Sequence, residues 1–108
     1  MNDVLYIICR NSLSIVDGWI PTPSTVIADE LKMPLYQVRK ELKRLKELGL
    51  VASTIYCDTD EYSSYAIRGY TITDKVKGTK EYKTAYEDEE KIEKECFDMI
   101  MTNEEMYK

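Results

Sequence analysis

The stretch STVIADELKMPLYQVRKELKRLKELGL, residues 24–50, decides the fold of this chain. Its first part has apolar Val26, Ile27 and Leu31 at helical spacing. Pro34 then interrupts the pattern, because proline lacks the amide proton that a continuing helix would use. The sequence therefore predicts a short helix that ends near Lys32.

A second helical pattern begins directly after Pro34. Its apolar residues are three and four positions apart, so they share one face of a helix, and they are Leu35, Val38, Leu42 and Leu45. We expect this face to be buried. Gly49 is expected to end the helix in the left-handed conformation, and residues 50–51 are expected to begin an extended segment.

Two segments rich in Val, Ile, Thr and Tyr follow, at residues 50–57 and 65–73. These residue types favour strands, and the polar stretch 58–64 between them predicts a hairpin. The predicted tip carries Asp58, Asp60 and Glu61. This acidic trio lacks the glycine and the distal glutamate of a calcium loop, so we expect no metal there.

The order of these elements resembles the winged helix-turn-helix family of DNA-binding domains. Residues 27–31 match the family's first helix, with the small Ala28 where the second helix packs closely, and residues 70–73 match the end of its second wing strand. The resemblance implies a mainly α structure with a small β-hairpin wing, an α+β fold. It places the helix-turn-helix at 24–48, the wing at 50–73 and a long C-terminal helix at 74–102. A generic helical hairpin is the alternative.

Further helices are expected on both sides of the motif. Asn2 or Asp3 can cap an opening helix, which is expected to contain Ile15 and Val16 near its end and to stop at Gly18. Trp19 is expected to seal the edge of the core, with ligand stacking as the alternative. Thr22 or Ser24 is expected to cap the first helix of the motif, and Thr73 the last helix of the chain.

The last helix carries more apolar residues than a winged-helix core needs. Those beyond residue 91 that recur at helical spacing are Ile92, Cys96, Met99 and Ile100. We interpret them as a homodimer interface, as in the MarR and PadR regulators that the layout resembles. The alternative is that this helix folds back on the first helix of the same chain.

Length and composition exclude several classes of protein. A chain of 108 residues suffices for a single domain, and no apolar run approaches the ~20 residues that cross a bilayer. There is no histidine, the commonest general base and metal ligand, so we expect neither an enzyme nor a cofactor. Cys9, Cys57 and Cys96 have no CxxC spacing, and we interpret them as reduced, mostly packed thiols of a cytoplasmic protein.

Positive charge is concentrated on the second helix of the motif, although the net charge of the chain is −5. The resemblance implies that the N-terminal half of this helix enters the major groove, with Tyr36, Gln37, Arg39 and Lys40 at base edges and Lys43 and Arg44 at phosphates. Arg68 is the only cation expected on the wing strands. The alternative is a solvated helix face with ion pairs, such as Lys40 toward Glu47 or Glu41 toward Lys46.

The leading hypothesis is a homodimeric regulator of bacterial or phage type that binds double-stranded DNA sequence-specifically. The acidic wing and a sequence pI near 4.8 favour a second hypothesis, a winged-helix module that binds protein and no DNA.

Overall fold

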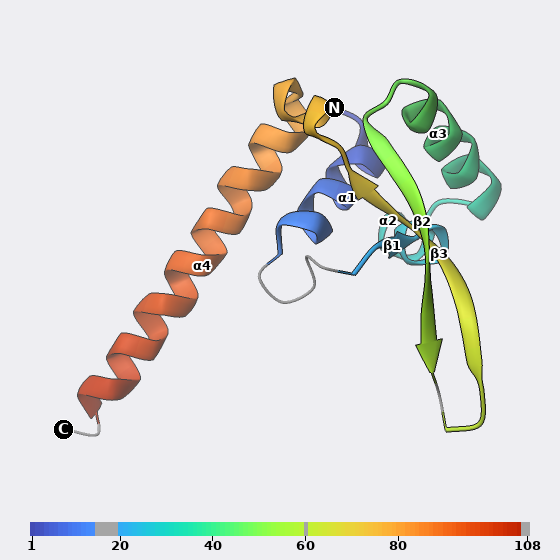
Figure 1. The fold of residues 1–108 in the computed structure, drawn as a ribbon. Coiled ribbons are helices and arrows are strands. Elements are labelled where there is room, and N and C mark those ends of the chain that lie inside the picture. The colour runs from blue at the N-terminus through green and yellow to red at the C-terminus, as the bar shows by residue number, and fades with distance from the viewer. Residues whose placement is uncertain (15–19, 60, 107–108) are drawn as a thin grey trace.

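The computed structural model describes residues 1–14, 20–59 and 61–106, with the backbone alone at residue 97 and over residues 99–106. A three-stranded antiparallel sheet of order β1-β3-β2 lies beside the helices (Figure 1), and the expected α+β class is confirmed. The elements in chain order are α1 (Asp3–Leu13), β1 (Thr22–Pro23), α2 (Ser24–Leu31), α3 (Leu35–Glu47), β2 (Val51–Thr59), β3 (Ser64–Ile72), the 3-10 helix η1 (Asp74–Gly78) and α4 (Lys80–Met106).

The core forms where α1 meets α2, α3 and α4. The predicted apolar face of α3 is buried, with Val38, Leu42 and Leu45 at most 1% exposed, while Leu35 is partly buried at the edge. The buried residues of α1 lie in the same cluster: Val4, Leu5, Ile8 and Cys9. Burial of one face of α3 leaves its opposite, cationic face in solvent.

The turn between α2 and α3 depends on two residues. Lys32 adopts the left-handed conformation at φ 53°, and its amide donates to the carbonyl of Ala28, which ends α2 where the sequence predicts. Pro34 is the N-cap of α3, and its carbonyl accepts from Val38 N. The expected cap of α2 is wrong, because Pro23 occupies that position without a side-chain bond and Thr22 lies in β1.

The wing hairpin is held in one register along its whole length. β2 and β3 pair antiparallel from Val51 opposite Ile72 to Thr59 opposite Ser64. β1 covers only the base of the hairpin, where Pro23 pairs with Gly69. A Cβ at Gly69 would lie 2.8 Å from the carbonyl carbon of Pro21, so the close approach of this segment requires glycine.

The opening helix begins as the sequence predicts and ends earlier. The Asn2 side chain accepts a hydrogen bond of 3.0 Å from Leu5 N and so caps α1. The helix stops at Leu13, with Ser14 already extended, rather than at Gly18. The predictions for Ile15, Val16 and Trp19 fall outside the described residues.

The last helix begins later than the sequence predicts. Thr73 does not cap it; the Thr73 hydroxyl instead donates to the carbonyl of Gly49 over 2.6 Å, and the short helix η1 follows. Thr79 provides the cap, because its hydroxyl oxygen accepts from Tyr82 N at 3.2 Å. Residues 74–78 therefore form a separate turn between the wing and α4.

The first part of α4 packs on α1 within the same chain, as one of the two interpretations of this helix expects. Ala85 is fully buried there. Arg10 Nε donates to Glu89 Oε1 over 2.9 Å, and the Tyr6 hydroxyl donates to Asp88. This bond to the Asp88 carboxylate is the main cause that raises the pKa of Tyr6.

The cysteines differ from the expectation of mostly packed thiols. Cys9 is fully buried in α1, whereas Cys57 and Cys96 are exposed. Burial raises the pKa of Cys9 to about 12. Within the described residues, no helix is long and apolar enough to cross a membrane.

Leu42→Ala or Leu45→Ala is expected to destabilise the protein by roughly 2–5 kcal/mol, because each removes a fully buried side chain and leaves a cavity. Urea denaturation followed by circular dichroism measures the change. Lys46→Ala on the exposed face of α3 is the control, and an unchanged midpoint for both leucine variants would contradict this packing.

A thiol reagent at neutral pH is expected to modify Cys57 rapidly and to leave Cys9 untouched until the protein unfolds, because the thiolate is the reactive form and burial disfavours it at Cys9. Mass spectrometry of the native protein after timed labelling identifies the modified residue. Equal labelling rates at the two positions would contradict the placement of Cys9 in the core.

Candidate nucleic-acid interface

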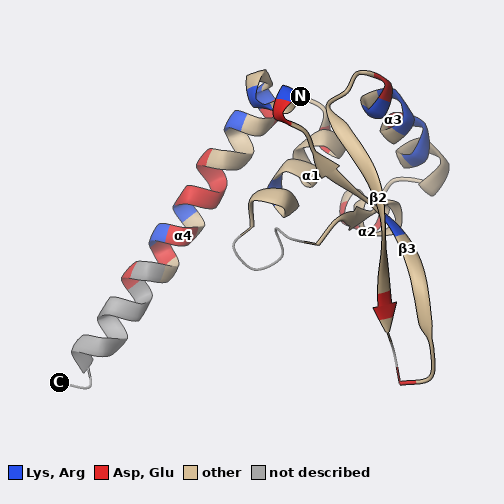
Figure 2. Cartoon of the chain, in the orientation of Figure 1, with Lys and Arg blue, Asp and Glu red and all other residues tan. Residues whose placement is uncertain are grey.

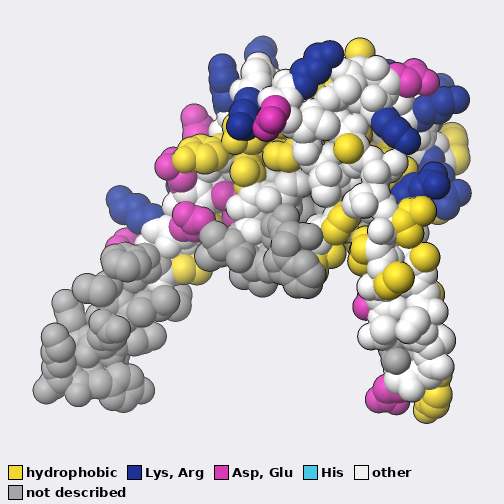
Figure 3. Space-filling model, viewed as in Figure 1, with side chains coloured by type: hydrophobic (Ala, Val, Ile, Leu, Met, Phe, Trp, Pro, Cys, Tyr) yellow, Lys and Arg dark blue, Asp and Glu magenta, His cyan; other side chains and the backbone are white. Residues whose placement is uncertain are grey.

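The exposed face of α3 carries most of the cations around the helix-turn-helix. Figure 2 shows lysine and arginine along α3, and Figure 3 shows dark blue side chains projecting from the same region. Tyr36 is 70% exposed near the start of the helix, beside Gln37, whose amide donates to the Tyr36 hydroxyl over 3.3 Å. The exposed cations of α3 are Arg39, Lys40, Lys43, Arg44 and Lys46.

One side of α3 faces the wing. Arg39 and Arg68 line a hollow of about 530 Å³ between α3 and β3, together with Ser24, Ile55, Ala66 and Tyr70. Among the described residues, neither arginine forms an ion pair with a carboxylate. Two free guanidinium groups in one hollow can receive a phosphate or another anion.

The other side of α3 faces the N-terminus of α1. Gln37, Lys40, Glu41 and Arg44 line a second hollow, of about 580 Å³, opposite Asn2 and Asp3. Here Arg44 pairs with Glu41, three residues earlier, through Nε at 3.0 Å and through Nη2. Neither ion pair named in the alternative, Lys40 toward Glu47 or Glu41 toward Lys46, is present among the described residues; Glu41 pairs with Arg44 instead. This contact lowers the pKa of Glu41.

The sequence groups the predicted DNA-contacting residues by role, as base contacts or phosphate contacts. The structure groups them by the side of α3 on which they lie, and the two groupings differ. Gln37 lies with Arg44 on the α1 side, whereas Arg39 lies with Arg68 on the wing side. At 100° per residue, Tyr36 and Lys43 point outward between the two sides, and Lys40 points outward at the edge of the α1 side. All seven predicted side chains are exposed, and six of them belong to this one helix.

The register of the hairpin separates the charges of the wing. Directly paired residues of antiparallel strands share a face, and successive residues alternate between faces. Arg68 pairs with Ile55, whereas Asp58 pairs with Tyr65 on the opposite face. Asp58 thus lies in β2, facing away from Arg68, and not in the tip where the sequence analysis placed it; Asp60 lies outside the described residues.

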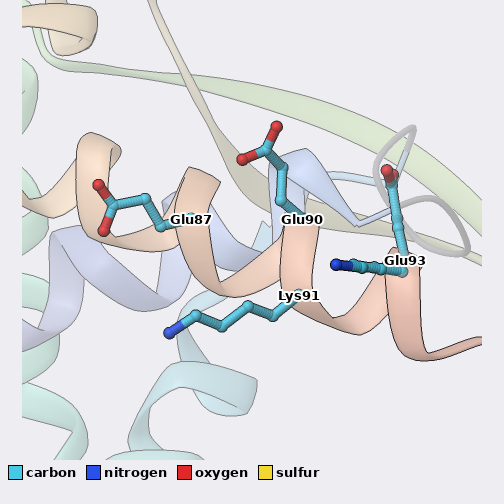
Figure 4. A pocket seen from close by; sticks show the side chains of 5 residues that line it. Glu87, Glu90, Lys91 and Glu93 are labelled. Atoms are coloured by element: carbon cyan, nitrogen blue, oxygen red, sulfur yellow. The ribbon is translucent and has the colours of Figure 1, made fainter.

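Another hollow among the described residues lies along α4 alone. It measures about 720 Å³ and is lined by Glu87, Glu90, Lys91, Glu93 and Lys94. Figure 4 shows Glu87, Glu90 and Lys91 pointing in different directions. No three cysteine, aspartate or glutamate side chains in the described part of the chain come close enough together to hold a metal ion.

Sequence reasoning missed several residues at this interface. Tyr70 lines the hollow of Arg39 and Arg68, and its position two residues after Arg68 on one strand was the available signal. The sequence indicates Asn2 and Asp3 only as helix caps, yet they border the hollow of Arg44. No sequence signal indicates this second contact, because it joins residues about forty positions apart.

The geometry of helices and hairpin defines a winged helix-turn-helix fold, and solved structures of that fold are similar to it over nearly the whole chain. A single-residue mutant of ZitR from Lactococcus lactis is 20% identical, with a TM-score of 0.53 over 97% of this chain. A ZitR structure described as a zinc-responsive MarR family member is 22% identical, with a TM-score of 0.51 over 92% of this chain.

The likeness to ZitR confirms the predicted winged-helix resemblance at the level of the fold. This chain spans about three fifths of the length of the two ZitR chains, 61% and 62%. No protein-family model matches the sequence, and no curated protein matches it.

Proposed function

We propose that this protein binds double-stranded DNA sequence-specifically and acts as a transcriptional regulator of bacterial or phage type. The observation that carries the proposal is the exposed cationic face of α3, flanked on the wing side by Arg68. In a chain with 20 acidic and 15 basic residues, this concentration of exposed cations on one helix is suited to phosphates. The similarity to ZitR, a MarR family member, supports the same proposal.

The geometry suggests how α3 would lie in the major groove. The outward residues Tyr36 and Lys40 would point to the groove floor, and Gln37 and Arg39 would reach base edges toward its two walls. Lys43 would contact a phosphate from the same helix, and Arg68 would contact the backbone that passes between α3 and the wing. Asp58 would stay on the far face of the wing, away from that backbone.

A protein-binding module is the second candidate, and the outer part of the wing favours it. β1 covers only Gly69 and Tyr70, so the strands beyond them form a two-stranded arm. Figure 3 shows apolar and acidic side chains along this arm, and none of its described residues beyond Arg68 is a cation. Its exposed side chains include Ile55 at 62%, Tyr62 at 93% and Tyr65 at 45%.

We also propose that α4 forms a homodimer. α4 has 27 residues and is about 40 Å long, whereas α1 with 11 residues is about 16 Å long at 1.5 Å per residue. The stripe of α4 that packs on α1 at Ala85 and Glu89 continues as Ile92 and Cys96, both exposed. A second α4 would cover this continuation; Met99 and Ile100, predicted for the same interface, have no described side chains.

Lys43→Ala and Arg68→Ala are each expected to weaken binding to all duplexes about equally and to flatten the dependence of log affinity on log salt by about one unit, because each removes one phosphate contact.

Gln37→Ala is expected to cost about 1–3 kcal/mol at the preferred site and little on random DNA, because it removes a base contact. Fluorescence anisotropy titrations at several salt concentrations measure both effects.

Lys91→Ala on α4 is the matched control for the DNA titrations, since it removes an exposed lysine away from α3. If the parent protein shows no salt-dependent affinity for any duplex at low ionic strength, DNA binding is refuted and the protein-binding candidate replaces it.

Ile92→Asp is expected to convert a dimer into a folded monomer, because it buries a charge in the proposed contact between two α4 helices. Light scattering gives the mass, and circular dichroism checks the fold. Lys91→Asp, on the neighbouring face of α4, should leave the dimer intact. A parent protein that is monomeric at high concentration would contradict the proposal.

A further inference from the structure

Arg44 differs from the other cations of α3 because its guanidinium group already forms an ion pair with a carboxylate. Its Nε and Nη2 both donate to the same oxygen, Glu41 Oε1. The Arg44 side chain is 56% exposed, whereas the Glu41 side chain is 27% exposed. A phosphate that approached Arg44 would therefore compete with the Glu41 carboxylate for the guanidinium group.

Glu41 is held in place from the side of α1. The side-chain amide of Asn2 donates to the same Glu41 oxygen that accepts from Arg44. Asn2 is also tied to α1 and α4: its Oδ1 accepts from Leu5 N at 3.0 Å, and its backbone N donates to Glu81 Oε1 at 2.8 Å. A chain of hydrogen bonds thus runs from Arg44 on α3 through Glu41 and Asn2 to Glu81 on α4.

Each of these hydrogen bonds between α3, Asn2 and α4 includes a charged group. The hydrogen bond from Arg44 is the main cause that lowers the pKa of Glu41, and the backbone hydrogen bond from Asn2 is the main cause that lowers the pKa of Glu81. Both carboxylates are therefore ionised at neutral pH and act only as acceptors. Movement of α4 along α1 would pull on Asn2 and so change how Glu41 holds Arg44.

We propose that Glu41 is a positioning residue that withholds Arg44 from DNA phosphate, and that Asn2 and Glu81 couple this restraint to the seating of α4 on α1. The inference rests on the proposed DNA binding. An exposed pair of this kind contributes little energy, so it tunes affinity rather than blocks it. A signal that shifts α4 would then change the affinity of α3 for DNA through Arg44.

The first test is a double-mutant cycle on DNA affinity. Glu41→Gln keeps the shape of the side chain and removes its charge, so it should raise duplex affinity by up to about five-fold, the upper limit for an exposed ion pair, and steepen the salt dependence by about one unit. In an Arg44→Ala background the same change should have almost no effect, because the released cation is absent.

Glu47→Gln is the matched control, since it removes the same charge from the exposed C-terminal end of α3, where no described residue pairs with Glu47. Its effect should be the same with and without Arg44. If Glu41→Gln acts equally in both backgrounds, or lowers affinity in the parent, the restraint on Arg44 is refuted. A parent protein without any salt-dependent binding refutes the proposed function instead.

The second test needs no DNA and follows the coupling to α4. Glu81→Ala removes the acceptor of Asn2 N and should raise the pKa of Glu41 toward its ordinary value in a carboxyl NMR titration of the whole chain. Glu81→Gln keeps an acceptor oxygen and should change the pKa of Glu41 less. Glu87→Ala, an exposed glutamate of the same helix, should leave it unchanged. An unchanged Glu41 titration in Glu81→Ala, with the fold intact by circular dichroism, would overturn the coupling.

Discussion

Burial of the apolar face of α3 is the contact on which the rest of this structure depends. Val38, Leu42 and Leu45 are at most 1% exposed, and they pack in one cluster with Leu5 and Ile8 of α1. Their burial fixes the rotation of α3 about its axis. The cations at the intervening positions must then point to solvent, so one hydrophobic contact both stabilises the domain and orients its proposed DNA-binding face.

The sheet adds a second constraint, which concerns charge on the wing. Because paired strands alternate faces, the register that sets Arg68 opposite Ile55 also sets Asp58 opposite Tyr65 on the other face. Arg68 consequently shares a hollow with Arg39 of α3, and Asp58 does not. Among the described residues, no acidic side chain of the wing lines the hollow between the wing and α3, and net charge alone is a poor guide to this surface.

The unequal lengths of α1 and α4 separate the two roles proposed for the last helix. Up to Glu89, α4 packs on α1 through Ala85 and through the pairs of Tyr6 with Asp88 and Arg10 with Glu89. Beyond that point the residues Ile92 and Cys96 of its stripe are exposed. Intrachain packing and self-association, first considered as alternatives, thus concern different parts of one helix, and the intrachain part carries the hydrogen bonds that reach Glu41 through Asn2.

Local patterns in the sequence determined the elements and the face of α3 that is buried. Apolar spacing predicted Val38, Leu42 and Leu45 in the core, Pro34 separated α2 from α3, and Gly49 took the expected left-handed conformation at φ 77°. These features depend on residues a few positions apart, whose relation the helix or turn itself sets. The helix caps were predicted less well. Thr22 pairs with Tyr70 in the sheet, and the Thr73 hydroxyl donates to the carbonyl of Gly49.

Contacts between distant segments were decided only by the tertiary structure. The meeting of Arg39 with Arg68 and the hydrogen bonds from Asn2 to Glu41 and Glu81 join segments far apart in the chain. The sequence by itself determined which residues are apolar, charged or able to end a helix. Which charges face each other depends on how the helices and the hairpin pack, and no local spacing specifies that.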